Sequence, residues 1–313
     1  MKAIVYTEFG PPQVLQLKEV EKPAPKDDEV LVKVYATPVS YGDLTARNFK
    51  NITASEFPMP LPLLLPMRMY FGFSKPKINI LGSEFAGVIA ATGKEVKRFK
   101  PGDAVMGYLG QRMGAYAEYV CMPEIGLLTS KPANMSFVEA ATVPYGAIMA
   151  SSLLRKGNLQ KGSKVLVNGA SGGIGSAAVQ LAKHDGAEVT GVCSTPRLDY
   201  VKSLGADRVI DYTREDFTVR GELYDVVFDA VAKIPRSKRR KALTPQGTYM
   251  SAHDDVGGEK VEDLLCLKAL AEAGKLRPVI DKTYSWEQIV EAHRYVDKGH
   301  KKGNVVITID HIN

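Results

Sequence analysis

The chain has 313 residues, enough for about two domains, and the composition of an ordinary globular protein. Apolar residues make up 45% and charged residues 24%, so a sizeable core can be buried. The basic residues behind the net charge of +6 are scattered, which argues against a nucleic-acid partner. No apolar run reaches the roughly 20 residues of a membrane-spanning helix, so a membrane partner is not expected. Three widely spaced cysteines and no secretory signal predict a reduced, cytoplasmic protein.

The first third of the chain contains short strand-like segments separated by turns. Turns are indicated at Gly10-Pro11-Pro12, at Gly42-Asp43 and at Pro101-Gly102-Asp103, where glycine and proline interrupt regular structure. This spacing is typical of a small barrel or sandwich. The strand-like segments are Ala3–Tyr6, Val30–Ala36, Glu84–Ala91, Ala104–Met106 and Ala115–Val120.

After about Pro132 the pattern changes to strands that alternate with helices. Short connections between them predict a parallel sheet with crossover helices, so the fold class is α/β. The tail, Asn304–Ile309, returns to strand character. The predicted strands are Lys164–Asn168, Glu188–Cys193, Arg208–Ile210 and Asp225–Asp229, and the predicted helices are Ser176–His184 and Leu198–Leu204.

A glycine-rich turn joins the strand Lys164–Asn168 to the helix that follows it. Glycine lets the backbone approach a pyrophosphate, and the helix N-terminus presents free N–H groups to the anion. The alternative is a tight turn without a ligand, but the strand–turn–helix context favours a dinucleotide. The residues predicted to bind the cofactor here are Ala170, Ser171, Gly172, Gly173, Ile174 and Gly175.

The end of the next strand distinguishes NAD from NADP. An NAD site usually offers an acid about 20 residues after the glycines, which binds the ribose 2′-hydroxyl. Here Ser194, Thr195 and Arg197 follow the strand, and it does not end on Asp or Glu. Hydroxyls and a guanidinium suit a 2′-phosphate, so NADPH is the predicted cofactor. The alternative for Arg197 is a solvent-facing residue at a helix start.

The whole chain resembles the zinc-independent medium-chain dehydrogenase/reductases, specifically the quinone oxidoreductase group. Each motif is modest alone, and the set is specific. The matching segments are Ala36-Thr-Pro-Val-Ser40-Tyr-Gly-Asp43, Ile80-Leu-Gly82-Ser-Glu84-Phe-Ala-Gly87, Phe99-Lys-Pro-Gly-Asp-Ala-Val-Met-Gly107, Gly114-Ala-Tyr-Ala-Glu-Tyr119 and Pro144-Tyr-Gly146.

This resemblance implies a GroES-like β-barrel domain and a Rossmann domain. The first would span residues 1–127 and be completed by 279–313, and the second would span 128–278. The resemblance also implies a substrate cleft between the domains and a possible homodimer. In NADPH-using members a basic residue after the second strand and a tyrosine after the third hold the 2′-phosphate, and Arg197 and Tyr212 stand at those positions.

The ligands that zinc-dependent relatives use are not present at the matching positions. Their cysteine would fall near Ser40–Gly42 and their histidine at Ser83. The five histidines of this chain all lie in its second half, and we expect no metal. Glu84 stands where zinc relatives keep an acid, and its expected role here is structural.

Without a metal to hold an alkoxide, a conjugated carbonyl is the easier hydride acceptor. We expect NADPH-dependent reduction of a small quinone or α,β-unsaturated carbonyl, with hydrogen bonds stabilising the enolate. Ser40 and Tyr41 are the candidates for polarising the carbonyl or donating the proton, and the alternative is that both only shape a loop. The competing functions are a zinc-less alcohol or carbonyl dehydrogenase and a non-catalytic NADPH-binding interaction or sensor protein.

Two segments depart from the family's pattern. The apolar stretch Met59–Phe73 is longer than usual and is interpreted as a lid, as one wall of a substrate pocket, as a membrane contact or as a packed excursion. After Ala252 the chain leads almost directly to a predicted helix, Val261–Ala273, so it is shortened there by about 20 residues relative to usual family connections. This shortening bears on dimer formation and on closure around the nicotinamide.

Overall fold

The computed structural model describes residues 1–53, 61–254 and 259–311. They form two compact units, with unit 1 comprising Met1–Pro144 and Ile280–Asn313 and unit 2 comprising Tyr145–Val279. The first boundary lies later than the one predicted after residue 127, because the strand Leu127–Ser130 pairs inside the sheet of unit 1. The second boundary differs by one residue from the prediction.

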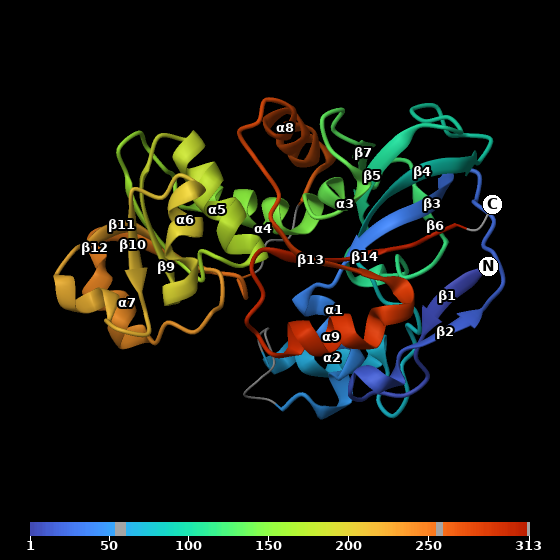
Figure 1. Cartoon of the computed structure of the whole chain (residues 1–313), viewed down its shortest axis with the longest axis horizontal. Coiled ribbons are helices and arrows are strands. Elements are labelled where there is room, and N and C mark those ends of the chain that lie inside the picture. The colour runs from blue at the N-terminus through green and yellow to red at the C-terminus, as the bar shows by residue number, and fades with distance from the viewer. Residues whose placement is uncertain (54–60, 255–258, 312–313) are drawn as a thin grey trace. The chain divides into compact units, whose positions relative to one another are not determined.

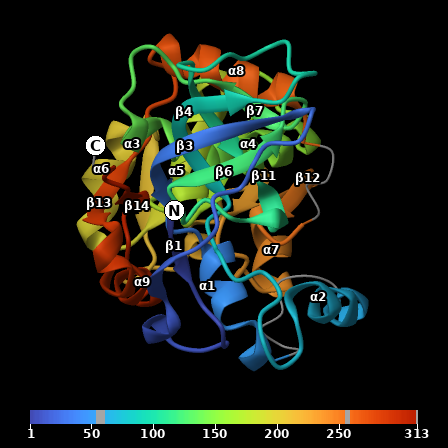
Figure 2. The same ribbon diagram turned by 90° about the vertical axis from the view of Figure 1, so that its right-hand side faces the viewer.

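Unit 1 is built around a mainly antiparallel sheet (Figures 1 and 2). Its strand order is β13-β14-β3-β4-β5-β7, β6 also pairs with β3, and β1 and β2 form a separate ribbon. The C-terminal segment completes this sheet, because β14 pairs antiparallel with the end of β3. The strands are β1 (Lys2–Val5), β2 (Gln16–Glu19), β3 (Glu29–Pro38), β4 (Glu84–Thr92), β5 (Ala104–Tyr108), β6 (Tyr119–Pro123), β7 (Leu127–Ser130), β13 (Ile280–Ser285) and β14 (Asn304–Thr308).

One hydrophobic core joins both segments of unit 1. Buried side chains of β3 and β4 pack with Trp286 and with Ile289 of the C-terminal segment. Burial of large apolar side chains stabilises such a core by about 1.5–3 kcal/mol each. The helices of unit 1 are α1 (Tyr41–Arg47), α2 (Leu64–Phe71), α3 (Phe137–Ala140) and α9 (Ile289–Asp297).

Unit 2 contains a five-stranded parallel sheet with the order β10-β9-β8-β11-β12. Numbered from the first strand of the unit, this order is 3-2-1-4-5. It is the doubly wound order, and the usual sixth strand is not found among the described residues. The order reverses beside β8, and α5 follows that strand. The elements are α4 (Pro144–Lys156), β8 (Lys164–Asn168), α5 (Gly173–His184), β9 (Glu188–Cys193), α6 (Leu198–Ser203), β10 (Arg208–Asp211), β11 (Tyr224–Asp229), α7 (Arg236–Ala242), β12 (Leu243–Ser251) and α8 (Val261–Glu272).

The predicted α/β class and the predicted parallel sheet are confirmed by this architecture. Among the described residues, one helical stretch, Phe137–Lys156, is long and apolar enough to cross a bilayer by length and composition. Its mean hydropathy is 1.3, and 72% of the window is buried. Core helices meet the same criteria, so this stretch is weak support for a membrane span.

Candidate active site

The glycine turn occupies the point where the strand order of unit 2 reverses. Gly169 and Ala170 both donate backbone hydrogen bonds to the Val192 carbonyl at 3.1 Å, which ties the turn to β9. Gly169 has φ +75°, a conformation that side chains disfavour. A Cβ on Gly175 would lie 2.1 Å from the Gly169 carbonyl oxygen, so only glycine allows α5 to start this close to β8.

The start of α5 has the space and the donors that a pyrophosphate requires. Gly172 caps the helix without a side-chain hydrogen bond, and the first-turn N–H groups have no acceptor within the helix. A Cβ on Gly172 would meet only the Gly169 oxygen, at 3.5 Å, so the fold itself has room for a side chain there. Glycine at this position fits close approach by a ligand.

The residues predicted to hold the 2′-phosphate lie at the same edge of the sheet. Ser194 and Thr195 follow β9, and Tyr212 follows β10, whose last residue pairs with Cys193. Tyr212 donates its backbone N–H to the Cys193 carbonyl at 3.1 Å, and its side chain is exposed. The structure therefore brings all ten predicted cofactor residues to the carboxyl ends of β8, β9 and β10, although their role in binding stays a prediction.

An acid that was not among the predicted residues also lies at this edge of the sheet. Asp211 ends β10, and it accepts hydrogen bonds from the Thr195 hydroxyl and from the Thr213 hydroxyl, the latter at 2.7 Å. These bonds lower the pKa of Asp211, with Thr195 the largest cause. Arg214 lies 3.6 Å from the same carboxylate. Strand pairing reveals this acid, because Asp211 is adjacent to Cys193 across the sheet and distant from it in sequence.

A buried carboxylate supports the turn from the neighbouring strand. Asp229 ends β11 with no solvent exposure and accepts hydrogen bonds from Asn168 at 2.8 Å, from the Ile234 backbone at 2.7 Å and from Tyr249 at 3.0 Å. Burial raises the pKa of the Tyr249 hydroxyl. Because Asn168 immediately precedes Gly169, these contacts stabilise the strand end from which the glycine turn starts.

In unit 1, the predicted catalytic pair lies at the start of α1. Ser40 is the N-cap: its hydroxyl accepts from the Asp43 N–H at 3.2 Å and donates to the Asp43 carboxylate at 2.7 Å. Its single hydroxyl proton is therefore engaged within the helix cap. Tyr41 is 59% exposed. Catalytic roles for Ser40 and Tyr41 stay predictions. The pattern Ser40-Tyr41-Gly42-Asp43, with an acid three residues after a serine, is the sequence signal for this cap.

Asp43 is fully buried and surrounded by donors. Besides Ser40, it accepts from the Gly82 N–H at 2.8 Å and from the Tyr116 hydroxyl. Burial raises the pKa of Asp43, and the hydrogen bonds from Ser40, Gly82 and Tyr116 oppose that increase. This carboxylate joins α1 to the segment before β4 and to the segment before β6.

The hydrogen-bonded network continues from Tyr116 to the C-terminal helix α9. His293 contacts the Tyr116 hydroxyl through Nε2 at 3.2 Å and Arg47 through Nδ1 at 2.7 Å. A guanidinium only donates, so Nδ1 accepts and the proton resides on Nε2. Arg47 also donates to Asp297 at 2.9 Å and to the Gly10 carbonyl at 3.1 Å.

We expect His293 to make the free energy of unfolding depend on pH. Burial, assisted by Arg47, holds its pKa well below 6.5, whereas the unfolded chain takes up the proton near pH 6.5. The unfolded state thus binds more protons in acid, and we expect the free energy of unfolding to fall by up to about 1.4 kcal/mol per pH unit below that point. Urea unfolding at several pH values measures the free energy of unfolding. In His293→Gln its decline below about pH 6.5 (the acid limb) should be less steep than in the wild type. The control His184→Gln, at an exposed histidine, should leave the acid limb unchanged. If both variants show the same acid limb, His293 is not the source of the pH dependence.

Glu84 has a cationic neighbour from the C-terminal segment. Glu84 is buried at the start of β4 and accepts through its backbone carbonyl from Thr37 at 2.8 Å. Burial lowers the pKa of Lys301 to about 8, while Glu84 and Asp281 oppose that decrease. The Lys301 ammonium donates to the Gly303 carbonyl at 2.8 Å. Lys301 carries no signal in the sequence, because only the return of the chain to unit 1 places it near Glu84.

Candidate metal ligands are dispersed over the described part of the chain. No three or more His, Cys, Asp and Glu side chains in residues 1–53, 61–254 and 259–311 are grouped to hold a metal ion. The positions expected to match zinc ligands lie near Ser40–Gly42 and at Ser83, where the chain has neither cysteine nor histidine. Independence from zinc stays a prediction.

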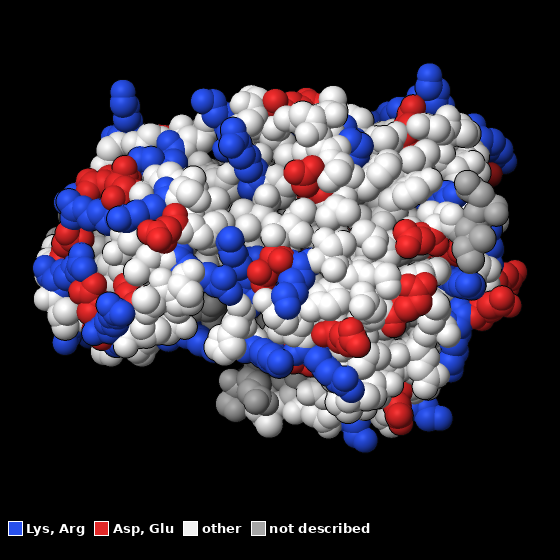
Figure 3. Space-filling view, in the orientation of Figure 1, with Lys and Arg blue, Asp and Glu red and all other residues white. Residues whose placement is uncertain are grey.

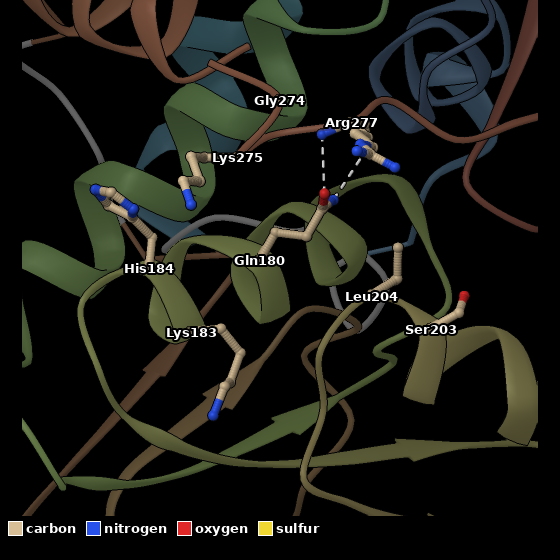
Figure 4. A pocket seen from close by; sticks show the side chains of 8 residues that line it. All are labelled: Gln180, Lys183, His184, Ser203, Leu204, Gly274, Lys275 and Arg277. Carbon is tan, nitrogen blue, oxygen red and sulfur yellow. Dashed lines mark hydrogen bonds between the residues drawn. The ribbon is translucent and has the colours of Figure 1, made fainter.

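A hollow of about 420 Å³ lies at the opposite end of α5 from the glycine turn (Figure 4). Gln180 there accepts from the Arg277 N–H at 2.8 Å and donates to its carbonyl at 3.1 Å, which holds the chain that leaves α8. Lys183 is engaged with Asp207 at 2.8 Å. The hollow belongs to neither group of predicted site residues.

Several charged side chains of unit 2 form ion pairs with each other. Arg208 pairs with Glu222, and Lys238 pairs with Asp216 at 2.7 Å. On the face shown in Figure 3, Lys and Arg lie among Asp and Glu over this unit. The expectation that no nucleic acid is a partner stays a prediction.

The proposed lid Met59–Phe73 is described from Leu61 onward, and Met59 and Pro60 lie outside the described residues, as do residues 255–258 after Ala252.

Known protein families match segments of both units of this chain. The alcohol dehydrogenase GroES-like domain matches residues 26–133, and two zinc-binding dehydrogenase families match residues 173–254 and 233–307. The 2-methylene-furan-3-one reductase of Solanum lycopersicum is 33% identical over 330 aligned positions, which cover 98% of this chain and 79% of the relative. The chloroplastic NADPH-dependent alkenal/one oxidoreductase of Arabidopsis thaliana is 31% identical, with the same coverage.

Solved structures agree with this placement. The quinone oxidoreductase from Coxiella burnetii superposes with a TM-score of 0.83 at 27% identity, over 99% of each chain. The 330 positions aligned with the Solanum relative exceed the 313 residues of this chain, so that relative has residues that this chain lacks. The chain belongs to the medium-chain dehydrogenase/reductase family, and its relatives include quinone and enone oxidoreductases.

Proposed function

We propose that the protein is an NADPH-dependent reductase of small quinones or α,β-unsaturated carbonyls that works without zinc. The observation that carries the proposal is the glycine turn at the strand-order reversal, with Arg197 and Tyr212 at the adjacent strand ends. The relatives named as alkenal/one and quinone oxidoreductases support the substrate class. A homodimer and a cytoplasmic location are part of the proposal as well.

The residues of unit 2 would bind and orient the cofactor. The first-turn N–H groups of α5 would receive the pyrophosphate, and Gly172 provides the space for its approach. Arg197 would face the 2′-phosphate with a charge of opposite sign. The bound nicotinamide would supply a hydride to the β-carbon of an enone or to a quinone.

The residues of unit 1 would receive the charge that develops on the substrate oxygen. Tyr41 has an exposed hydroxyl with which to donate a hydrogen bond to that oxygen. Ser40 has its proton engaged with Asp43, so its contribution would be to hold the start of α1, on which Tyr41 stands. Tyr41 is therefore the stronger donor candidate of the two.

The experiment follows the loss of NADPH absorbance with 1,4-benzoquinone, an alkenal and a simple saturated aldehyde. We expect turnover of the first two and little of the third, with unchanged rates after incubation with a zinc chelator. Turnover of the aldehyde alone would indicate a carbonyl dehydrogenase. Tight NADPH binding without turnover of any of the three would contradict the proposal and favour a sensor.

Arg197→Gln tests the choice of cofactor. We expect the dissociation constant for NADPH to rise about tenfold or more, because one charged contact to the 2′-phosphate is lost, which corresponds to about 1.4 kcal/mol. The dissociation constant for NADH should not change. Fluorescence titration with each nucleotide measures both constants, and Arg236→Gln on α7 is the control for lost positive charge. An equal loss of affinity for NADPH and NADH would contradict the assignment.

A further inference from the structure

Helix α2 of unit 1 is apolar on two opposite faces. Leu64, Met67 and Phe71 lie on the face that packs against the core of the unit. Leu65 and Met69, one helical turn apart, point away from that core and are 60% and 58% exposed. A surface helix normally turns polar side chains outward, so the outer face of α2 needs a physical explanation.

Exposed apolar side chains concentrate at this helix. Among the described residues, twelve large hydrophobic side chains are exposed, and five of them fall within residues 63–73. We call these five the α2 patch: Leu63, Leu65, Met69, Tyr70 and Phe73. Figure 2 shows α2 at the edge of unit 1, beyond α1. Clustered apolar exposure of this kind marks an interaction surface.

The charged residues in the sequence around the α2 patch are almost all positive. The only acid in residues 49–83 is Glu56, which lies outside the described residues. Lys77 donates to the Met69 carbonyl at 2.7 Å, which holds its charge at the end of α2. Lys50 belongs to a short helical turn, Phe49–Asn51, that contacts α2. The basic residues of this range are Lys50, Arg68, Lys75 and Lys77.

We propose that the α2 patch binds the surface of an anionic lipid bilayer. Leu65, Met69 and Phe73 would enter the acyl region, while the surrounding lysines meet lipid phosphates and Tyr70 lies at the interface. A second copy of the chain fits this surface less well, because a symmetric contact would bring two sets of cations together. Overall composition does not indicate a membrane partner, because it averages apolar residues over the whole chain. The fold exposes several of them together on one helix, α2.

Vesicle co-sedimentation of the full chain tests the apolar part of the proposal. The probes are vesicles of phosphatidylcholine alone and of phosphatidylcholine mixed with phosphatidylglycerol. The protein should sediment with the mixed vesicles, and Leu65→Ser combined with Met69→Ser should lower its partition coefficient about tenfold or more. The matched control combines Ile125→Ser with Val219→Ser, at positions 82% and 72% exposed elsewhere, and should bind like the wild type.

A second variant tests the charges and does not disturb the apolar contacts of α2. Lys50→Gln combined with Lys75→Gln should weaken binding to the mixed vesicles about tenfold, and added salt should do the same. Lys97→Gln combined with Lys241→Gln is the control for the lost charges. The proposal is overturned if the wild type sediments with neither vesicle, or if both patch variants bind like their controls. It is also overturned if the wild type is a dimer in solution that the serine variant converts to a monomer, because the α2 patch is then a self-association surface.

Discussion

Alanine substitutions at Gly175 and Gly172 are expected to separate folding from cofactor binding. Gly175→Ala places a Cβ 2.1 Å from a backbone oxygen, so the turn must shift, and the free energy of unfolding should fall by about 1–3 kcal/mol. The displaced start of α5 should also lose NADPH affinity. Gly172→Ala meets only ordinary contact at 3.5 Å and should cost about 1 kcal/mol or less, as a weaker helix cap.

The Gly172 variant should nevertheless bind NADPH at least about tenfold more weakly, because its methyl group enters the space through which the pyrophosphate approaches. Urea unfolding of the ligand-free protein and fluorescence titration with NADPH measure the two effects separately. If Gly172→Ala binds NADPH as well as the wild type while folding normally, the anion does not lie at this turn.

Replacement of Arg47 by methionine should destabilise unit 1 by about 3–5 kcal/mol, because it leaves buried partners without a donor. The Arg47 side chain is 5% exposed, and its guanidinium donates to His293, to the Gly10 carbonyl and to Asp297 at once. Loss of the positive charge also lets His293 accept a proton more readily. We therefore expect the midpoint of urea unfolding to fall at neutral pH and its further decline in acid to be shallower than in the wild type, because the pKa of His293 in the folded state moves closer to its unfolded value.

The matched control is Arg220→Met, which removes an arginine whose ion pair with Glu215 lies at the surface. Exposed pairs contribute about 0–1 kcal/mol, so this variant should unfold almost like the wild type. A loss at Arg47 no larger than that at Arg220 would show that the buried network does not hold α1 and α9 together.

The regular elements of unit 2 follow from local pattern. The strands β8 and β9 occur at the predicted residues, because a parallel strand buried on both faces is a nearly continuous apolar run. The predicted Arg208–Ile210 and Asp225–Asp229 each lie within one residue of the observed strand ends. Edge strands were harder to predict. β2 and β13 are largely exposed or half-buried, so their sequences lack the apolar signal of a strand.

The sequence by itself determined the α/β class, the glycine turn and the residues after β9, because each depends on neighbours along the chain. Tertiary structure alone decided which distant groups meet. It placed Asp211 beside Thr195 through strand pairing, and it brought the Gly82 N–H to the buried carboxylate of Asp43. It also turned one apolar face of α2 outward. Burial and charge pairing are properties of surroundings assembled from remote segments, and local sequence does not encode them.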